Sequence, residues 1–282
     1  MIIDFRYHIA SLAAVFLALG LGILIGSSLL SDEKLYEQQG KLVDRLEADL
    51  ASLRQDKRNL EEEIVSLELA LKREEQFGQA ALPLLTRNKL TGQRLAIVQL
   101  TQTTVSSEVS ALKNCLQQAG AEVISTTSLL RYSDDEQLAE VLESEGDSME
   151  QLINHLAQTL AMGLGREGLA PLERLGYLQL GGDYHLPVQT VILYLGNVTV
   201  PKEVATSLVQ ACSEYQVRVA AVENSGAPSS SLSEKGILMV DNIDQTSGKV
   251  ALIYALATDG LGHFGIKEGA QAFLPELGKQ EQ

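Results

Sequence analysis

The side chains that could ligate a metal ion through imidazole or thiolate are few and widely spaced in this sequence. They are His8, His155, His185 and His263, together with Cys115 and Cys212. A chelating histidine pair would stand at i and i+4 of a helix or at i and i+2 of a strand, because these spacings place two side chains on one face. Neither spacing occurs, and the cysteines are too far apart for a Cys-x-x-Cys site. The spacing therefore leaves the metal-binding residues unknown.

Soft sulfur ligands favour copper(I). Besides the two cysteines, the sulfur-containing side chains are Met1, Met149, Met162 and Met239. Cys115 and Cys212 fall on or beside the apolar faces of predicted helices, where a free cysteine usually acts as a small buried hydrophobe. His155 and Met162 stand seven residues apart on one predicted helix and could share a face. No cofactor can be assigned from these patterns.

Motifs for nucleotide binding or covalent catalysis are missing from the sequence. No Gly-x-Gly-x-x-Gly follows the first predicted strand, and neither a Gly-x-x-x-x-Gly-Lys-Ser/Thr loop nor a Gly-x-Ser-x-Gly elbow occurs. The formal charge is −15 and the pI is near 4.7, which is the wrong sign for binding nucleic-acid phosphates. We therefore predict a protein that is not an enzyme and has no nucleic-acid partner.

Residues 9–30, IASLAAVFLALGLGILIGSSLL, contain no charged side chain. As a helix this segment would be about 33 Å long, enough to cross a hydrocarbon core of about 30 Å. A cleaved signal peptide normally has a shorter apolar region followed by an Ala-x-Ala-like site. We predict an uncleaved membrane anchor at 1–30; a cleaved signal peptide and a buried soluble helix are the alternatives.

Small residues recur at every fourth position of this segment, from Ala10 through Ala14, Ala18 and Gly22 to Gly26. Such a stripe lets two membrane helices approach closely, although alanine and glycine are also simply frequent in membrane spans. The charges near the two ends of the span favour neither orientation clearly. Arg6 and the terminal amine precede it, while the lysines and arginines that follow lean weakly toward a cytoplasmic domain.

Residues 31–78 form a predicted coiled-coil stalk, because they contain no proline and repeat aliphatic side chains in heptads. Position a holds Val43, Leu50, Lys57, Ile64 and Leu71, and position d holds Leu46, Leu53, Leu60 and Leu67. A parallel homodimer is the simplest interpretation. In it Asp49 would meet Arg54 favourably, but Glu63 would repel Glu68. A trimer, a heteromeric partner helix and a helix folded back on its own domain remain open.

The predicted dimer would use both the anchor and the stalk. Its contact residues would be Ala14, Ala18, Gly22, Gly26, Leu46, Leu50, Leu53, Leu60, Ile64 and Leu67.

Residues 79–282 alternate short apolar runs with amphipathic segments, which predicts an α/β, Rossmann-like domain with a doubly wound, mainly parallel sheet. About five strands are expected, at 95–100, 121–125, 188–195, 217–222 and 236–240. Helices are expected at 105–119, 148–162, 201–215 and 247–257, and a helical insertion at about 128–186.

Ligands of such sheets bind beyond the carboxyl ends of the strands. The polar residues expected there are Thr101, Thr103, Thr104, Asn197, Glu223, Asn224, Ser225, Asp241 and Asn242. A polar crevice at this edge is generic to the fold, so these residues predict a place for a ligand but not its identity.

Four segments of the chain together resemble the copper-transport (MctB-like) membrane protein family. They are HIASLAAVFLALGLGILIGSSLL, the coiled coil behind it, LPLLTRNKLTGQRLAIVQL at the start of the sheet, and the closing GHFGIKEGAQAFLP. The resemblance implies a role in copper homeostasis that keeps intracellular copper low, and some family members are described as channel-forming proteins of an outer membrane. It also implies a cytoplasmic N-terminus and a globular domain outside the cytoplasm, with copper as the only metal suggested.

Two functions follow from these observations. The first, implied by the resemblance, is a single-pass cell-membrane protein of copper homeostasis. The second, based on the architecture, is a dimeric cell-envelope scaffold for wall assembly or division, whose α/β domain docks an envelope protein partner at the membrane lipid surface.

Overall fold

The computed structural model describes residues 5–100, 106–132, 136–142, 147–197, 201–228, 232 and 236–276. It divides into two compact units, Met1–Lys72 and Arg73–Gln282. One helix, α1 (Phe5–Thr86), contains most of the first unit and ends in the second.

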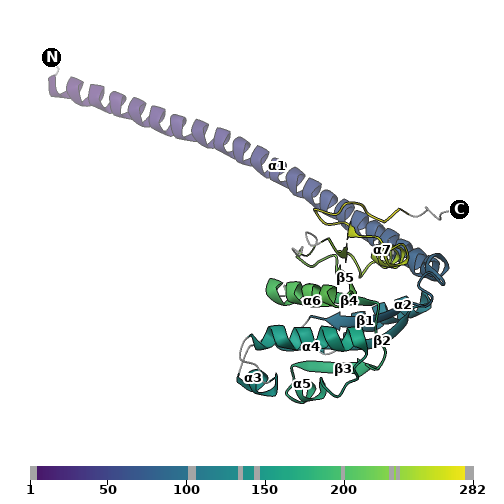
Figure 1. Ribbon diagram of the computed structural model, residues 1–282. Coiled ribbons are helices and arrows are strands. Elements are labelled where there is room, and N and C mark those ends of the chain that lie inside the picture. The colour runs from purple at the N-terminus through teal and green to yellow at the C-terminus, as the bar shows by residue number, and fades with distance from the viewer. Residues whose placement is uncertain are drawn as a thin grey trace. The chain divides into compact units, whose positions relative to one another are not determined.

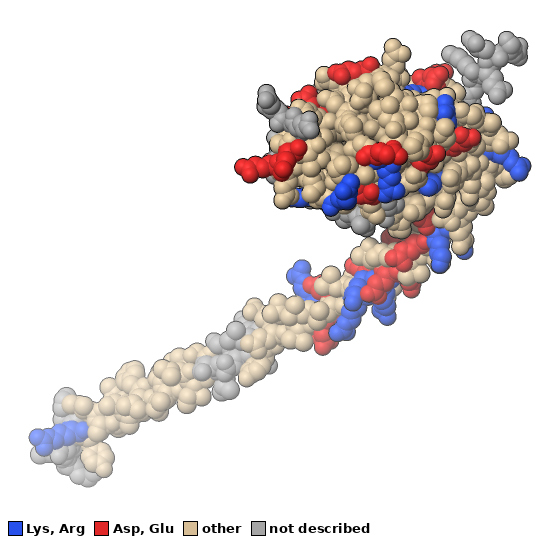
Figure 2. Space-filling model, turned by 60° about the horizontal axis from the view of Figure 1, so that its bottom comes forward, with Lys and Arg blue, Asp and Glu red and all other residues tan. Residues whose placement is uncertain are grey.

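The N-terminal part of α1 is long and apolar enough to cross a membrane. The segment Arg6–Ser27 has 22 residues and a mean hydropathy of 2.5, and none of its most apolar stretch is buried within the chain. Figure 2 shows a largely uncharged surface here and side chains of both charge signs further along the same helix. The predicted apolar N-terminal helix is therefore present.

The heptad residues of the first unit have no covering partner within the described chain. The six aliphatic residues predicted to form the dimer contact are each between 50 and 63% exposed: Leu46, Leu50, Leu53, Leu60, Ile64 and Leu67. In the apolar segment Ala14, Ala18 and Gly22 are exposed and Gly26 is partly exposed. Lys57 at heptad position a turns outward, with its Nζ 3.5 Å from a Glu61 carboxylate oxygen. The coiled coil remains a prediction. The exposed aliphatic heptad residues form the apolar surface that pairing with another helix would require.

The second unit is built on a mixed sheet of seven strands among the described residues, in the order β3-β2-β1-β4-β5-β6-β7. Strand β3 is antiparallel to β2, and the other neighbours are parallel. The strands are β1 (Arg94–Gln99), β2 (Glu122–Leu129), β3 (Leu178–Gly182), β4 (Thr190–Gly196), β5 (Arg218–Glu223), β6 (Leu238–Val240) and β7 (Gly262–Phe264).

Two clusters of buried side chains pack on this sheet, because successive residues of a strand point to opposite faces. On one face, helices α4 and α6 lie side by side and cover a cluster that includes Val98 and Leu193 (Figure 1). We call it the α4–α6 cluster. Ile97 and Ile192 belong to the α2–α7 cluster, which the partly buried Leu82 of α1 also contacts. The helices are α2 (Ser107–Gln118), α3 (Glu136–Leu142), α4 (Ser148–Met162), α5 (Ala170–Arg174), α6 (Lys202–Glu214) and α7 (Thr246–Ala257).

The C-terminal end of α1 is part of the second unit. The Tyr254 hydroxyl of α7 donates a hydrogen bond to the Leu85 carbonyl oxygen at 3.1 Å, and Thr86 is buried. A Cβ atom at position 78 would lie 2.9 Å from the Thr246 hydroxyl oxygen, so Gly78 permits a close approach to the start of α7. The end of the long helix is thus anchored on the α2–α7 side of the sheet.

The α/β class and the mostly parallel sheet agree with the sequence prediction, but the strand count of about five was too low. Strand β3 lies inside the stretch 128–186 that was predicted to be a helical insertion. It escaped prediction because LQLGG has only two aliphatic residues and ends in two glycines, which are depleted in strands. Strand β7 has only three residues, too few for a recognisable alternation.

Candidate functional site

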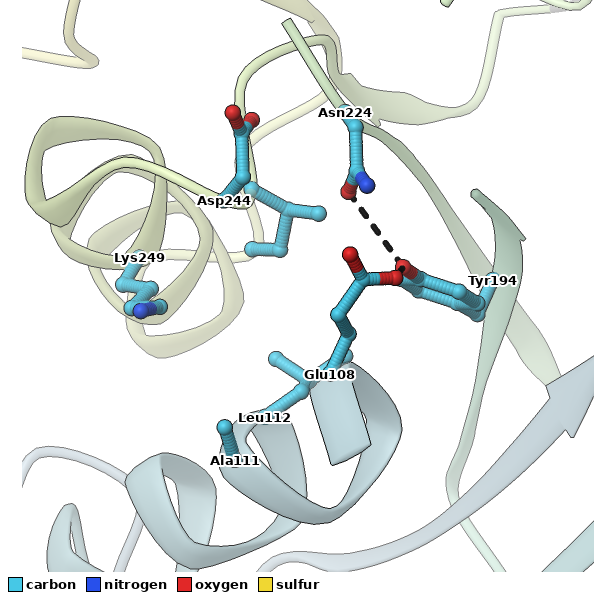
Figure 3. Close-up of a pocket in the computed structure, with 8 residues that line it drawn as sticks. Glu108, Ala111, Leu112, Tyr194, Asn224, Asp244 and Lys249 are labelled. Atoms are coloured by element: carbon cyan, nitrogen blue, oxygen red, sulfur yellow. Dashed lines mark hydrogen bonds between the residues drawn. The ribbon is translucent and has the colours of Figure 1, made fainter. Parts of the chain in front are cut away.

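A partly open cavity of about 250 Å³ lies at the carboxyl edge of the sheet, between the first turns of α2 and α7 (Figure 3). Its lining residues are Glu108, Ala111, Leu112, Tyr194, Asn224, Ile243, Asp244 and Lys249. Strand β4 contributes Tyr194, and Asn224 follows directly after β5. The cavity therefore combines two buried polar groups, one in a strand and one just after a strand, with charged groups from α2, α7 and the turn before α7.

Local sequence signals fix the two helix starts. The Ser106 hydroxyl accepts a hydrogen bond from the Val109 N–H at 3.2 Å and caps α2, which places Glu108 in the first turn. Before α7, the Asn242 side-chain amide donates to the Ser247 hydroxyl at 3.0 Å. A Cβ atom at position 248 would collide with the Asn242 carbonyl oxygen, so only glycine allows α7 to begin this close to β6.

Tyr194 is the central hydrogen-bonding group of the cavity. Its hydroxyl donates to a Glu108 carboxylate oxygen at 2.6 Å and lies 3.3 Å from the Asn224 side-chain oxygen. Burial, and next the neighbouring Glu108 carboxylate, raise the pKa of the Tyr194 phenol above its usual range. The phenol therefore stays protonated and acts as a donor near neutral pH.

The charged side chains of the cavity differ in how far their hydrogen-bonding capacity is used. Both Asp244 oxygens accept bonds from Ser225, one from its N–H at 2.7 Å and one from its hydroxyl at 2.6 Å. Glu108 receives the Tyr194 hydroxyl on one oxygen only. Among the described residues the Lys249 ammonium group has neither an ion-pair nor a hydrogen-bond partner, whereas its backbone N–H donates to the Gln245 carbonyl oxygen. One carboxylate oxygen and one ammonium group are therefore available to a ligand.

A second polar cluster lies buried at the same edge of the sheet. Asp241 accepts hydrogen bonds from the Ile266 and Lys267 N–H groups at 2.7 and 2.9 Å, and its other contact is His263 Nε2 at 2.8 Å. The Lys267 ammonium donates to a Glu223 carboxylate oxygen at 2.8 Å, with both side chains under 10% exposed.

The closing segment approaches this cluster so tightly that a Cβ atom at position 265, where φ is 143°, would collide with the Asp241 carboxylate. A buried charge needs such pairing to be tolerated. The cluster therefore holds the closing segment against the sheet.

The polar residues predicted at the strand ends lie in different parts of the second unit. Asn224 lines the cavity, Ser225 holds Asp244, and Asn242 is buried at the start of α7. Glu223 and Asp241 belong to the buried ionic cluster, and Asn197 is exposed in a turn. The predicted residues Thr101, Thr103 and Thr104 lie outside the described residues.

Sequence reasoning missed Glu108, Tyr194 and Lys249, and it also missed His263 and Lys267 as partners of the strand-end carboxylates. The one available signal was the segment GHFGIKEGA, which combines glycines with a histidine and a lysine.

Among the residues that the structure describes, the candidate metal ligands do not converge. Cys115 belongs to the α2–α7 cluster and Cys212 to the α4–α6 cluster, so the sheet separates them. Burial raises the pKa of the Cys115 thiol, and raises that of Cys212 to about 12, which keeps both protonated. His155 is partly buried while Met162 is 53% exposed. Within the described part of the chain no group of three or more His, Cys, Asp or Glu residues could hold a metal ion.

These features define a class: an α/β protein whose N-terminal helix is long and apolar enough to cross a membrane. The family described as "Copper transport outer membrane protein, MctB" matches residues 2–275, and the chain belongs to this family. A comparison with curated proteins gave no match. The family assignment suggested by the opening, central and closing segments is thus confirmed.

Proposed function

We propose that this chain is a single-pass membrane protein of copper homeostasis, with a cytoplasmic N-terminus and the α/β unit outside the cytoplasm. The observation that carries the proposal is the family match over residues 2–275, because it covers both units and is not limited to a common domain. The family is described by copper transport and by an outer-membrane location, and the placement in the cell membrane is our proposal.

A helical membrane attachment agrees best with the described elements. The segment Arg6–Ser27 alone meets the length that a membrane helix needs, about 20 apolar residues. The described strands have three to eight residues, shorter than the roughly 9 to 11 residues of a strand that spans a bilayer. These lengths support anchoring through α1.

The proposed assembly is a parallel homodimer through α1. It would cover the half-exposed heptad residues, of which Leu53 is the most exposed at 63%. We further infer that the α/β unit is doubly wound, since α2 follows β1 on one face and α6 follows β4 on the other. That arrangement would make the β1–β4 border the place where ligands bind.

The described residues of one chain do not form a soft-ligand site for copper, because the two thiols are buried and protonated on opposite faces of the sheet. We therefore base the proposed role on the level of copper across the membrane and assign no copper ligands.

The test compares intracellular copper in a strain lacking the gene with the same strain carrying the full chain. Deletion should raise cellular copper and lower growth in copper-containing medium, and the wild-type chain should restore both. Leu17→Asp combined with Val15→Asp should not restore them, because each aspartate near the centre of a membrane helix costs about 2.5–3.5 kcal/mol. Ser52→Asp, on the exposed stalk, is the matched control.

Orientation is measured in the same cells with Ser52→Cys and a membrane-impermeant maleimide. Labelling of intact cells is expected at position 52 only, since the two native thiols are buried. Unchanged copper content after deletion would refute the proposed function, and protection of position 52 until lysis would reverse the proposed orientation.

A further inference from the structure

The charged side chains that line the cavity between α2 and α7 are two carboxylates, Glu108 and Asp244, and one ammonium group, Lys249. Glu108 comes from the first turn of α2 and Lys249 from the first turn of α7 (Figure 3). No ion pair within 4.0 Å joins them. A ligand with one positive and one negative group would match both sides.

The inner end of the cavity supplies directional hydrogen bonds. Asn224 is 3% exposed and contacts Tyr194 through its side-chain oxygen, while its amide nitrogen has no hydrogen-bond partner among the described residues. This nitrogen is not among the fully buried side-chain atoms that lack a partner, so water or a ligand oxygen in the cavity can accept from it. The nitrogen belongs to a residue that lines the cavity, so a ligand oxygen placed there would satisfy it.

The remaining lining is apolar. Leu112 and Ile243 are 2% and 3% exposed, and Ala111 lies beside them on the wall formed by α2. The volume of about 250 Å³ lies below the roughly 300–1,000 Å³ of sites for drug-sized ligands. A complementary molecule is therefore small and carries a short aliphatic group besides its charges.

A divalent cation is a poorer match for the same cavity. Both Asp244 oxygens are already used by Ser225, which leaves Glu108 as the one carboxylate with a free oxygen. The Lys249 ammonium lies on the opposite side and repels a cation. Hard cations take six or more oxygen ligands in typical sites, and the cavity does not offer them.

We propose that this cavity binds a free α-amino acid with a short aliphatic side chain. The ligand ammonium pairs with Glu108, its carboxylate pairs with Lys249 and accepts from the Asn224 amide, and its side chain packs on Leu112 and Ile243. This inference goes beyond copper homeostasis and does not depend on it.

The test is calorimetric titration of the full chain in detergent micelles with L-valine. Two analogues separate the charged ends: L-valinamide lacks the carboxylate, and 2-hydroxy-3-methylbutanoate lacks the ammonium. The wild-type chain should bind valine a few-fold more tightly than either analogue, because each analogue lacks one of the two charges and the partners are an exposed Glu108 and a partly exposed Lys249.

Two substitutions test which side chain binds which charged group of the ligand. Lys249→Gln should weaken valine binding and abolish the preference over valinamide, whereas Glu108→Gln should abolish the preference over the hydroxy acid while keeping an acceptor for Tyr194. Lys202→Gln and Glu150→Gln change the same residue types in the first turns of α6 and α4, on the other face of the sheet, and should leave binding unchanged.

The proposal is overturned if the wild-type chain shows no saturable heat with valine at millimolar concentrations, or if it binds the analogues as tightly as valine. These two outcomes need no variant, so a folding defect cannot obscure them. Equal loss of binding in the control variants would likewise place the ligand elsewhere. Copper measurements are independent of each result.

Discussion

The stalk of α1 and the sheet of the second unit are both rich in aliphatic residues but use them differently. Leu53 of the stalk is 63% exposed, whereas Leu193 of β4 is fully buried. Burying a leucine side chain contributes about 1.5–3 kcal/mol. The second unit obtains this contribution within one chain, while the stalk can obtain it only when another surface covers the helix.

The two regions differ in their ion pairs in the same way. The Lys57–Glu61 pair of the stalk has side chains 76% and 60% exposed, and the Lys267–Glu223 pair of the second unit has side chains 9% and 2% exposed. Exposed pairs contribute about 0–1 kcal/mol because water screens them. Removing one partner of a buried pair leaves an uncompensated charge and costs much more.

The largest expected effect comes from Asp241→Ala. The substitution leaves the Ile266 and Lys267 N–H groups and the His263 ring without their acceptor, and should destabilise the second unit by about 3–5 kcal/mol. Urea unfolding of the full chain in micelles measures it. Glu61→Ala in the stalk is the control and should change stability by less than about 1 kcal/mol. Similar losses in both variants would contradict the difference between buried and exposed pairs.

The same leucine-to-alanine substitution, made once in the core and once in the stalk, tests the difference between the buried and the exposed leucines. Leu193→Ala should cost about 2–5 kcal/mol of unfolding free energy, because it leaves a cavity in the core. Leu53→Ala should leave that free energy unchanged and instead reduce crosslinking between chains in membranes. If Leu53→Ala destabilised the second unit as strongly as Leu193→Ala, the stalk would not be independent of the core.

The smallest effect concerns pH. The Cys212 thiol has a folded pKa of about 12, above the unfolded value of 9.0, because it is buried. Its stabilising contribution is complete below pH 9 and is lost as the pH rises toward 12, since only the unfolded thiol ionises there. Between about pH 8 and about pH 10 the wild-type chain should lose about 1.4 kcal/mol more than Cys212→Ala. Parallel pH profiles of the two proteins would show that the thiol is accessible in the folded state.

Helices and strands could be predicted from the sequence wherever the hydrophobic pattern was continuous. The helix at Ser148–Met162 has the predicted bounds, and the strand predicted at 188–195 lies at Thr190–Gly196. Both segments repeat aliphatic residues with the period of their own structure. Strands β3 and β7 could not be found in this way, since their stability comes from pairing with neighbours distant in sequence.

The candidate site was only partly predictable for the same reason. The rule that ligands bind beyond the carboxyl ends of the strands predicted Asn224. It did not predict Tyr194, which stands within a continuous apolar strand. Glu108 and Lys249 resemble ordinary solvated helix residues, and only the packing of α2 beside α7 brings them to one cavity. A charged residue whose role depends on a neighbour distant in sequence has no local motif by which it could be recognised.

The helix α1 runs without interruption from Phe5 to Thr86, so the small-residue stripe ending at Gly26 and the heptads beginning at Val43 have a fixed rotation relative to each other. Each residue added between them would turn one face by about 100° relative to the other. A dimer that used both faces, as proposed, would therefore depend on the number of residues in the connecting turns, even where the identity of those residues is immaterial. Inherited insertions of one residue should be tolerated there far less readily than insertions of seven.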